Sequence, residues 1–265
     1  MYTGAALYQT EAISPTEAFG LGEAFFHAMG VSKITDGGYY KLLEDGDHDG
    51  DFDLEEVPAA ALKEKLHDGE ADTFWLYGNA SDPWSASFHY ATGRFGSFPH
   101  IQLQFAKPLK ELYPAITGWL KEAAQQFSFP YGILYEADSP IRTLNYAEGH
   151  NLTTLFPNEN GFAWSRETPG LYERQARYTG QMLRMVYPCN LLNYRHLHLQ
   201  IGGTALQDWI SGTKTHGSLT QAGDDMWMWE APSEQLAELN KALGEAGLLV
   251  AWRPEAPRKA KRRLP

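Results

Sequence analysis

Cysteine, secretion signals and long hydrophobic runs are scarce or missing in this 265-residue sequence. Cys189 is the only cysteine, so no intramolecular disulfide can form. No run approaches the roughly 18 consecutive apolar residues of a membrane-spanning helix. The opening stretch, MYTGAALYQTEA, has no basic segment followed by a long apolar one, as a secretory signal would. We therefore expect a protein of the reducing cytoplasm that has no contact with membrane.

Motifs for nucleophilic or metal-dependent catalysis are also missing. The sequence contains no G-x-S-x-G, no H-E-x-x-H, no glycine-rich phosphate loop and no C-x-x-C. Cys189 stands among apolar residues in YPCNLL, which indicates packing and not reactivity. We expect a protein that is not an enzyme, with no catalytic residue and no required cofactor.

Basic residues are sparse outside the last twelve positions. The net charge is −11, and the terminal segment PEAPRKAKRRLP (254–265) alone carries +4, which leaves about −15 for residues 1–253. A body this acidic should repel nucleic acid and anionic membranes and attract basic partners. The terminal segment is typical of a disordered basic tail.

Apolar residues are plentiful and regularly spaced. They make up 43% of the chain, which predicts a globular core. SPTE at 14–17 predicts a helix start with a capping box. HIQLQFA at 100–106 alternates in the way of an antiparallel strand with one face in water. In that strand we expect three side chains to point inward (Ile101, Leu103, Phe105) and three to point outward (His100, Gln102, Gln104).

The remaining patterns predict an α+β fold with two lobes of antiparallel sheet covered by helices. A stretch rich in Asn, Gly, Pro and Ser, residues 138–170, predicts the boundary between the lobes. The expected domains are residues 1–138, 139–253 and the tail 254–265. Further expected strands cover 3–9, 72–78, 85–91, 131–137, 225–231 and LLVAW (248–252). Further expected helices begin near Pro58 and Pro114 and cover 171–186, GTALQDWI and 233–246.

Residues 45–56, DGDHDGDFDLEE, match the calcium loop of an EF-hand, with Gly50 at the sharp turn and Phe52 at the apolar eighth position. Calcium prefers six to eight oxygen ligands, and carboxylates occupy each ligand position of the pattern. The candidate calcium ligands are Asp45, Asp47, Asp49, Asp51 and Glu56, with Asp53 at the ninth position.

The flanks of this loop argue against a complete EF-hand. Pro58 would fall inside the exiting helix, and Gly37 and Gly38 shorten the entering one. Phe52 and Leu54 alternate with acids, which predicts a hairpin with strands near 39–44 and 51–56. Eight carboxylates and no Lys or Arg lie within 44–56, so a bound Ca²⁺ or a basic partner would relieve their repulsion. A solvated acidic loop with no specific ion also fits.

Two smaller features have competing interpretations. His196 and His198 could be zinc ligands on one face of a strand, but no third ligand has convincing spacing, which favours structural histidines. The many aromatic residues mostly predict core packing, and a few could be exposed anchors for a partner. The candidate anchors are Tyr39, Tyr40, Trp75 and Trp84.

Four segments occur in order in the second half of the chain: MLRMVYPCNLLNYRHL, GTALQDWISG, GSLTQAGDDMWMWEAP and LNKALGEAGLL. Over about residues 180–250 this run resembles the immunity proteins of bacterial type VI secretion, a family of unknown function. The resemblance implies a protein that binds a secreted antibacterial effector, with a nuclease toxin as the expected effector, and neutralises it. The shared motifs are packing motifs, so the resemblance transfers no site residues.

The acidic composition supports the same interpretation by separate reasoning. A nuclease needs a cationic surface to hold phosphates, and an acidic inhibitor can occupy that surface. Two alternatives stay open. One is a calcium-binding hydrolase that uses the 45–56 carboxylates, and the other is a calcium-responsive adaptor.

Overall fold

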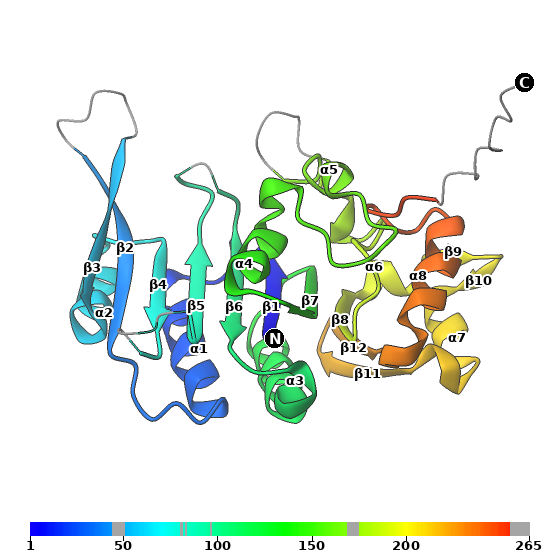
Figure 1. Ribbon diagram of the computed structural model, residues 1–265, viewed down its shortest axis with the longest axis horizontal. Helices are drawn as coiled ribbons and strands as arrows, with labels where there is room; N and C mark the ends of the chain where they lie inside the picture. The colour runs from blue at the N-terminus through cyan, green and yellow to red at the C-terminus, as the bar shows by residue number, and fades with distance from the viewer. Residues whose placement is uncertain (44–50, 80–81, 83, 96, 169–174, 255–265) are drawn as a thin grey trace, which may run out of the picture.

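One ten-stranded antiparallel sheet forms the centre of the molecule. The computed structural model describes residues 1–265 except 44–50, 80–81, 83, 96, 169–174 and 255–265. The strand order is β11-β12-β8-β7-β1-β6-β5-β4-β2-β3, and the strands stand side by side along the long axis of the molecule (Figure 1). The fold is therefore α+β, as the sequence predicts.

The sheet strands are β1 (Tyr2–Tyr8), β2 (Asp36–Leu42), β3 (Phe52–Pro58), β4 (Phe74–Tyr77), β5 (Ala86–Ala91), β6 (His100–Phe105), β7 (Tyr131–Ala137), β8 (Cys189–Asn193), β11 (Ser218–Gly223) and β12 (Met226–Glu230). A separate two-stranded hairpin contains β9 (Gln200–Ile201) and β10 (Thr204–Ala205). The helices are α1 (Pro15–Ala28), α2 (Ala59–His67), α3 (Leu109–Gln126), α4 (Pro140–Glu148), α5 (Gly161–Trp164), α6 (Tyr194–Leu197), α7 (Leu206–Ser211) and α8 (Leu236–Glu245).

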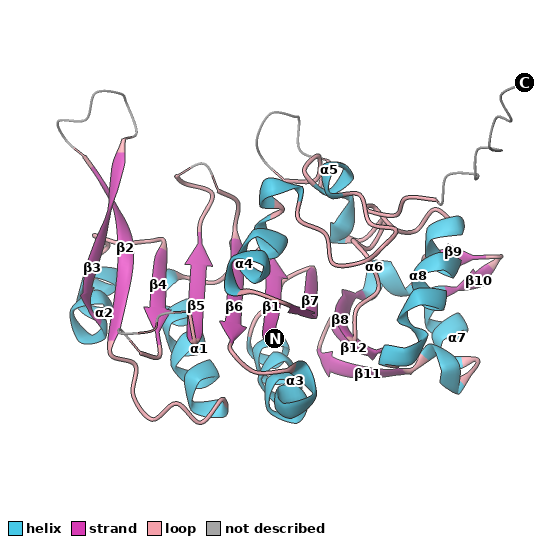
Figure 2. Cartoon of the chain, in the orientation of Figure 1, coloured by secondary structure: helices cyan, strands magenta, loops and turns pink. Residues whose placement is uncertain are grey.

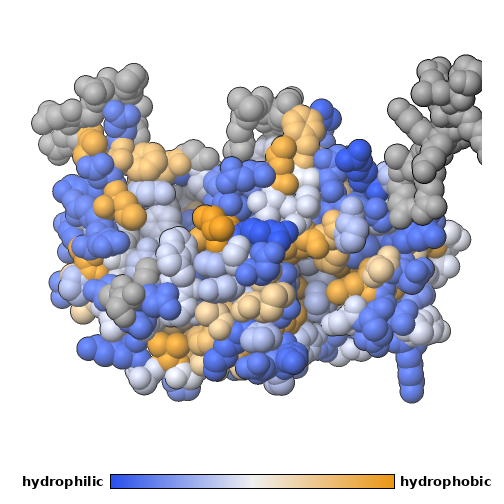
Figure 3. Space-filling model, in the orientation of Figure 1, coloured by the Kyte–Doolittle hydropathy of each residue, from blue (hydrophilic) through white to orange (hydrophobic). Residues whose placement is uncertain are grey.

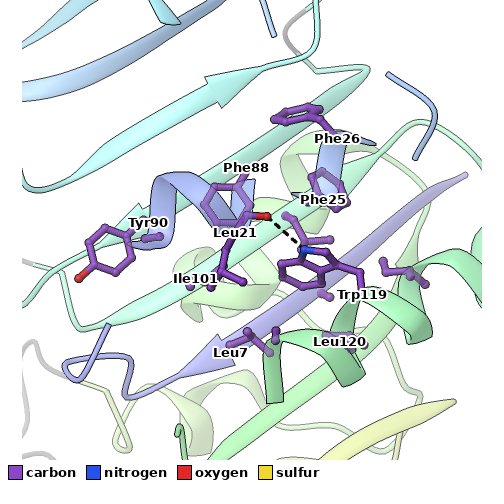
Figure 4. Close-up of a cluster of buried hydrophobic side chains, with 14 of the residues drawn as sticks. Leu7, Leu21, Phe25, Phe26, Phe88, Tyr90, Ile101, Trp119 and Leu120 are labelled. Atoms are coloured by element: carbon purple, nitrogen blue, oxygen red, sulfur yellow. Dashed lines mark hydrogen bonds between the residues drawn. The ribbon is translucent and has the colours of Figure 1, made fainter. Parts of the chain in front are cut away.

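Each face of the sheet carries its own hydrophobic core. On one face, α1, α2 and α3 cover the inward side chains of β4, β5, β6 and β1. Trp119 of α3 lies at the centre of this core, where its indole N–H donates to the Leu21 carbonyl at 3.1 Å (Figure 4). On the other face, α4, α5, α7 and α8 cover β1, β7, β8 and β12. The centre of the molecule is thus a helix–sheet–helix arrangement of three layers.

Helix cover is incomplete on the second face. In the view of Figure 2, α4 lies in front of β6 and β1, whereas α1 and α2 lie behind β2 to β5. No helix of the described chain covers the front of β2 to β5. This open face of the sheet carries the candidate site residues described below.

Several local predictions are confirmed. Ser14 and Glu17 form the predicted capping box at the start of α1. The hairpin predicted from Phe52 and Leu54 is present, with β2 and β3 paired from Asp36↔Pro58 to Leu42↔Phe52. Strands flank the acidic loop on both sides, so the helix–loop–helix form of an EF-hand is excluded.

Three predicted elements are wrong. Pro114 lies inside α3 and does not begin it, because burial of Leu109 and a 2.6 Å bond from its N–H to the Glu136 carboxylate start the helix earlier. In the described part of 171–186, the only helical turn is a 3₁₀ turn at Arg177–Thr179. LLVAW forms no regular strand, and residues 183–184 instead exchange backbone hydrogen bonds with residues 248–251.

The polar side chains of β6 are buried, whereas the alternation predicts that they face water. His100, Gln102 and Gln104 are 0% exposed, although the pattern predicts a face in water. Helix α4 packs on β6, and the Gln104 amide donates to the Trp84 carbonyl of the loop before β5 at 3.1 Å. The alternation correctly identifies which residues share a face, but it carries no information about what covers that face.

The two predicted lobes share the continuous sheet. Strand β7 pairs with β8 from Tyr131↔Leu192 to Leu134↔Cys189, so backbone hydrogen bonds cross from residues 1–138 to 139–253. Residues 138–170, predicted as the boundary, contain α4 and α5. The division into two domains stays a prediction.

Replacing Gly149 with alanine is expected to destabilise the protein by about 2–3 kcal/mol. Gly149 ends α4 with φ +80°, and an added Cβ would lie 2.6 Å from Cδ1 of the buried Trp164. Gly30→Ala is the matched control, since Gly30 has φ +76° with no atom within 4 Å of the added Cβ. Denaturant unfolding should show a loss of about 1 kcal/mol for the control. Equal losses for the two variants would contradict the steric part of the argument.

Candidate functional site

The β2–β3 hairpin presents a surface that is both acidic and apolar. Strand β3 ends the sheet order, so its outer edge pairs with no strand of the described chain. Phe52 and Leu54 are 38% and 48% exposed, and the carboxylates of Asp53 and Glu56 are exposed beside them. Orange and blue side chains alternate on this hairpin in Figure 3. Exposed apolar side chains next to carboxylates are suited to bind a partner that is basic at its rim.

An aromatic row leads from the hairpin into the open face of the sheet. The Tyr40 ring lies 4.5 Å from Phe52, 4.7 Å from Trp75 and 5.1 Å from Phe95, between ring centroids. Trp75 in turn stacks on His89 at 4.2 Å with an interplanar angle of 5°. Of the predicted aromatic anchors, Trp84 is exposed, Tyr40 and Trp75 are half-buried, and Tyr39 is buried.

The candidate calcium ligands fall partly outside the described residues. Asp45, Asp47 and Asp49 belong to the segment 44–50, whereas Asp51 immediately precedes β3 and Glu56 lies within it. Calcium binding by this loop stays a prediction.

At the inner end of the aromatic row lies a histidine–carboxylate cluster that the sequence patterns did not reveal. His89 of β5, His100 of β6 and Glu148 at the end of α4 place their donor atoms within 4.8 Å of one another. Glu148 Oε1 lies 3.6 Å from His89 Nδ1 and 3.8 Å from His100 Nε2. Its other oxygen, Oε2, lies 2.7 Å from Nδ1 of the exposed His150.

The local fold explains how these residues meet. In the β5–β6 register His89 pairs with Gln102 and His100 with Ala91, so the two histidines are diagonal neighbours on one face. The hydroxyl of Tyr8 donates to the Ala147 carbonyl at 3.0 Å and holds the end of α4 over this face. The next residue of that helix is Glu148.

Polar atoms in and around the cluster are buried without hydrogen-bond partners among the described residues. They include both ring nitrogens of His89, Nε2 of His100 and both amide atoms of Gln102. Buried polar groups are nearly always paired, and each orphan costs about 1–3 kcal/mol. Such a concentration of orphans on one face of a sheet indicates a place where a polar ligand is held.

Electrostatics in the cluster favour a charged carboxylate beside neutral or cationic rings. Burial alone would raise the pKa of Glu148, but its contacts with His100, His150 and His89 outweigh burial and hold that pKa well below its usual range. Burial lowers the pKa of His89, whereas the Glu148 carboxylate raises that of His150. The negative charge of Glu148 therefore persists at neutral pH, with His89 held toward its neutral form.

A separate pocket of about 1040 Å³ opens between the start of α3, the end of β7 and the loop after β12. Both carboxylates in its wall are engaged, since Glu136 accepts from the Leu109 N–H and Glu230 accepts from the Tyr113 hydroxyl at 3.0 Å. The rest of the wall is largely apolar. The pocket thus offers a shaped surface, with its two acids committed to holding α3 in place.

The other candidates from the sequence have structural roles here. His196 lies in α6, 0% exposed, where Nδ1 accepts from the Asn193 N–H and the Nε2 side contacts the Tyr178 carbonyl. His198 is exposed and bonded to the Tyr194 carbonyl, so the two histidines do not form one site. Cys189 is fully buried, and burial raises the pKa of its thiol, which makes it unreactive.

Comparison with known proteins gives a fold match. No protein-family model and no curated protein matches the chain. Among solved structures, the chain is similar to the T6SS protein PA0821 of Pseudomonas aeruginosa, with a TM-score of 0.55 and 11% sequence identity. The match covers 97% of this chain and 76% of that one. At this identity the match shows a shared fold. Within the described residues, no helix combines the length and apolar character that crossing a bilayer requires.

Proposed function

We propose that this chain is a cytoplasmic immunity protein that binds and neutralises an antibacterial effector of type VI secretion, specifically a nuclease toxin. The observation that carries the proposal is the β2–β3 hairpin, where exposed Phe52 and Leu54 lie among carboxylates at the edge of the sheet. The fold shared with a T6SS protein supports it, as does the acidic body of the chain. A finer relation, to TsiT, the immunity partner of the nuclease effector TseT, is part of the same proposal.

The proposal assigns the chain no reaction of its own and no required cofactor. The partner is a toxin with a cationic surface, and the chain competes with nucleic acid for that surface without binding nucleic acid itself. Phe52, Leu54 and Tyr40 supply the apolar centre of the contact, and the acids of the hairpin form its rim and steer association.

Co-expression with a candidate nuclease toxin, first of all any toxin found encoded beside this gene, tests the function directly. Cells that carry both proteins should survive at toxin levels that kill cells carrying the toxin alone. Cell death despite folded, abundant immunity protein would overturn the proposal.

Charge changes on the hairpin should weaken the complex. We expect Asp53→Asn/Glu56→Lys to lower toxin affinity by about 10–100-fold, mostly through slower association, because both carboxylates are exposed where steering acts. The matched control, Glu122→Lys/Glu238→Gln, changes the net charge by the same amount on exposed positions of α3 and α8. Surface plasmon resonance at two salt concentrations measures both variants. Equal losses for the two variants would show that net charge acts and not this hairpin.

A further inference from the structure

The cluster of His89, His100 and Glu148 has the composition and spacing of a transition-metal site. We propose that these three side chains bind a late first-row divalent cation, with Zn²⁺ as the representative ion. This site is separate from the acidic hairpin and goes beyond the proposed inhibition of a toxin.

The spacing fits tetrahedral coordination. Zn–N and Zn–O bonds of about 2.0–2.2 Å at tetrahedral angles place donor atoms about 3.3–3.6 Å apart. The Glu148 Oε1 atom lies 3.6 Å from His89 Nδ1 and 3.8 Å from His100 Nε2. Shifts of a few tenths of an ångström in the side chains therefore bring each carboxylate–imidazole pair to coordination distance.

The two histidines each place a ring nitrogen where it can act as a metal ligand. Nδ1 of His100 lies 2.8 Å from the Phe98 carbonyl, which can only accept, so in the neutral ring Nδ1 carries the proton and Nε2 has its lone pair free toward Glu148. A backbone carbonyl on the far nitrogen is the usual outer contact of a metal-bound imidazole. Both nitrogens of His89 are buried without a hydrogen-bond partner in the part of the chain that the structure describes, and the stacked Trp75 fixes the plane of its ring.

The donor set selects the class of cation. Two imidazoles and one carboxylate suit Zn²⁺ and its neighbours, whereas Ca²⁺ and Mg²⁺ require an all-oxygen set. The outer oxygen of Glu148 is held by His150 at 2.7 Å, and the His150 side chain is 64% exposed, so the carboxylate is oriented from the solvent side. With three protein ligands, the fourth position is left to water or to a partner's side chain.

Calorimetric titration of the chelator-treated full-length protein with Zn²⁺ at pH 7.5 tests the site. We expect one saturable equivalent, and a loss of affinity of more than about 100-fold for His89→Gln and His100→Gln, because losing a ligand exceeds the 10- to 100-fold cost of an outer-contact change. His150→Gln removes an outer contact that is exposed to solvent and should lose about 10-fold, the low end of that range. The exposed His198→Gln is the matched control and should bind as the wild type does.

Several outcomes would overturn the assignment. The first is that the wild type shows no saturable Zn²⁺ binding at millimolar concentration. The second is that His89→Gln and His100→Gln both bind Zn²⁺ as the wild type does. The third is that His198→Gln loses Zn²⁺ binding. Should the ligand variants fail to fold by circular dichroism, Co²⁺ bound to the wild type decides. An intense visible spectrum typical of four-coordinate Co²⁺ supports the site, and the weak spectrum of six-coordinate Co²⁺ contradicts it.

Discussion

Replacing Glu159 with glutamine is expected to lower the free energy of unfolding by about 3–5 kcal/mol. Glu159 lies 3.5 Å from Nε of Arg184, and both side chains are 0% exposed. The glutamine would keep the shape but leave the Arg184 guanidinium as an uncompensated buried charge. Arg184 also packs 3.6 Å from the centre of the Tyr146 ring, so it cannot move to water without breaking the second core. Because whole domains are stable by only about 5–15 kcal/mol, this loss is a large share of the total.

A double-mutant cycle in urea separates the pair from its surroundings. Arg184→Met should also be strongly destabilising, since the Glu159 carboxylate is then buried alone, although the Tyr146 hydroxyl and the Leu155 N–H still donate to it at 2.8 Å each. The double variant should cost clearly less than the sum of the single ones. Glu23→Gln is the control, because its ion pair with Lys63 is exposed and should be worth less than about 1 kcal/mol. Strictly additive costs would show that the two buried charges do not compensate each other.

The buried pair of Glu159 and Arg184 explains why residues 138–170, which the composition predicts as a boundary, are partly buried in the core. Residues 138–170 read as a polar boundary because they are rich in Asn, Gly, Pro and Ser. In the structure Glu159 holds this segment against the sheet through Arg184, and Trp164 is fully buried in the same core. Local composition cannot signal such a segment, because its partners lie some 25 residues away and its burial depends on charge compensation in three dimensions.

Elements driven by local chemistry were predictable. The capping box of α1 depends on Ser14 and Glu17 alone, and the hairpin depends on the alternation of Phe52 and Leu54. The histidine–carboxylate cluster was not predictable in this way. His89 and Glu148 are 59 positions apart and meet only because α4 returns across the sheet, so no spacing rule links them. One hint was present, since the polar face of 100–106 contains a histidine and two glutamines where charged residues are more usual on a wet face.

The acidic hairpin and the aromatic row also differ in how far the sequence predicts them. The acidic hairpin could be identified from the sequence because its carboxylates lie close together in the chain, and their charge favours exposure. The aromatic row from Phe52 through Tyr40 and Trp75 to His89 uses residues from four strands, so it depends on register. That row places the proposed partner surface and the proposed metal site on one continuous face.

Acid is expected to destabilise the protein through His196, by on the order of 3 kcal/mol between pH 6.5 and pH 4. Burial lowers the pKa of His196 from its usual 6.5 to about 4, although its backbone contacts with Tyr178 and Met182 oppose this shift. The unfolded chain therefore takes up a proton first as the pH falls. The contribution of His196 to stability is complete above pH 6.5 and is lost as the pH falls toward 4. Protonation would also place a second N–H at Nδ1, which now accepts from Asn193.

The glutamine variant at this position isolates the effect. His196 occupies the third position of a capping box in α6, where glutamine is a usual residue, so His196→Gln can keep the bond to the Asn193 N–H. Urea unfolding at several pH values from 7.5 to 4.5 should give wild-type protein a steeper loss of stability than this variant, by up to about 1.4 kcal/mol per pH unit. The exposed His198→Gln should keep the wild-type slope. If His196→Gln keeps it too, the acid sensitivity of the fold has its origin in other groups, such as His89.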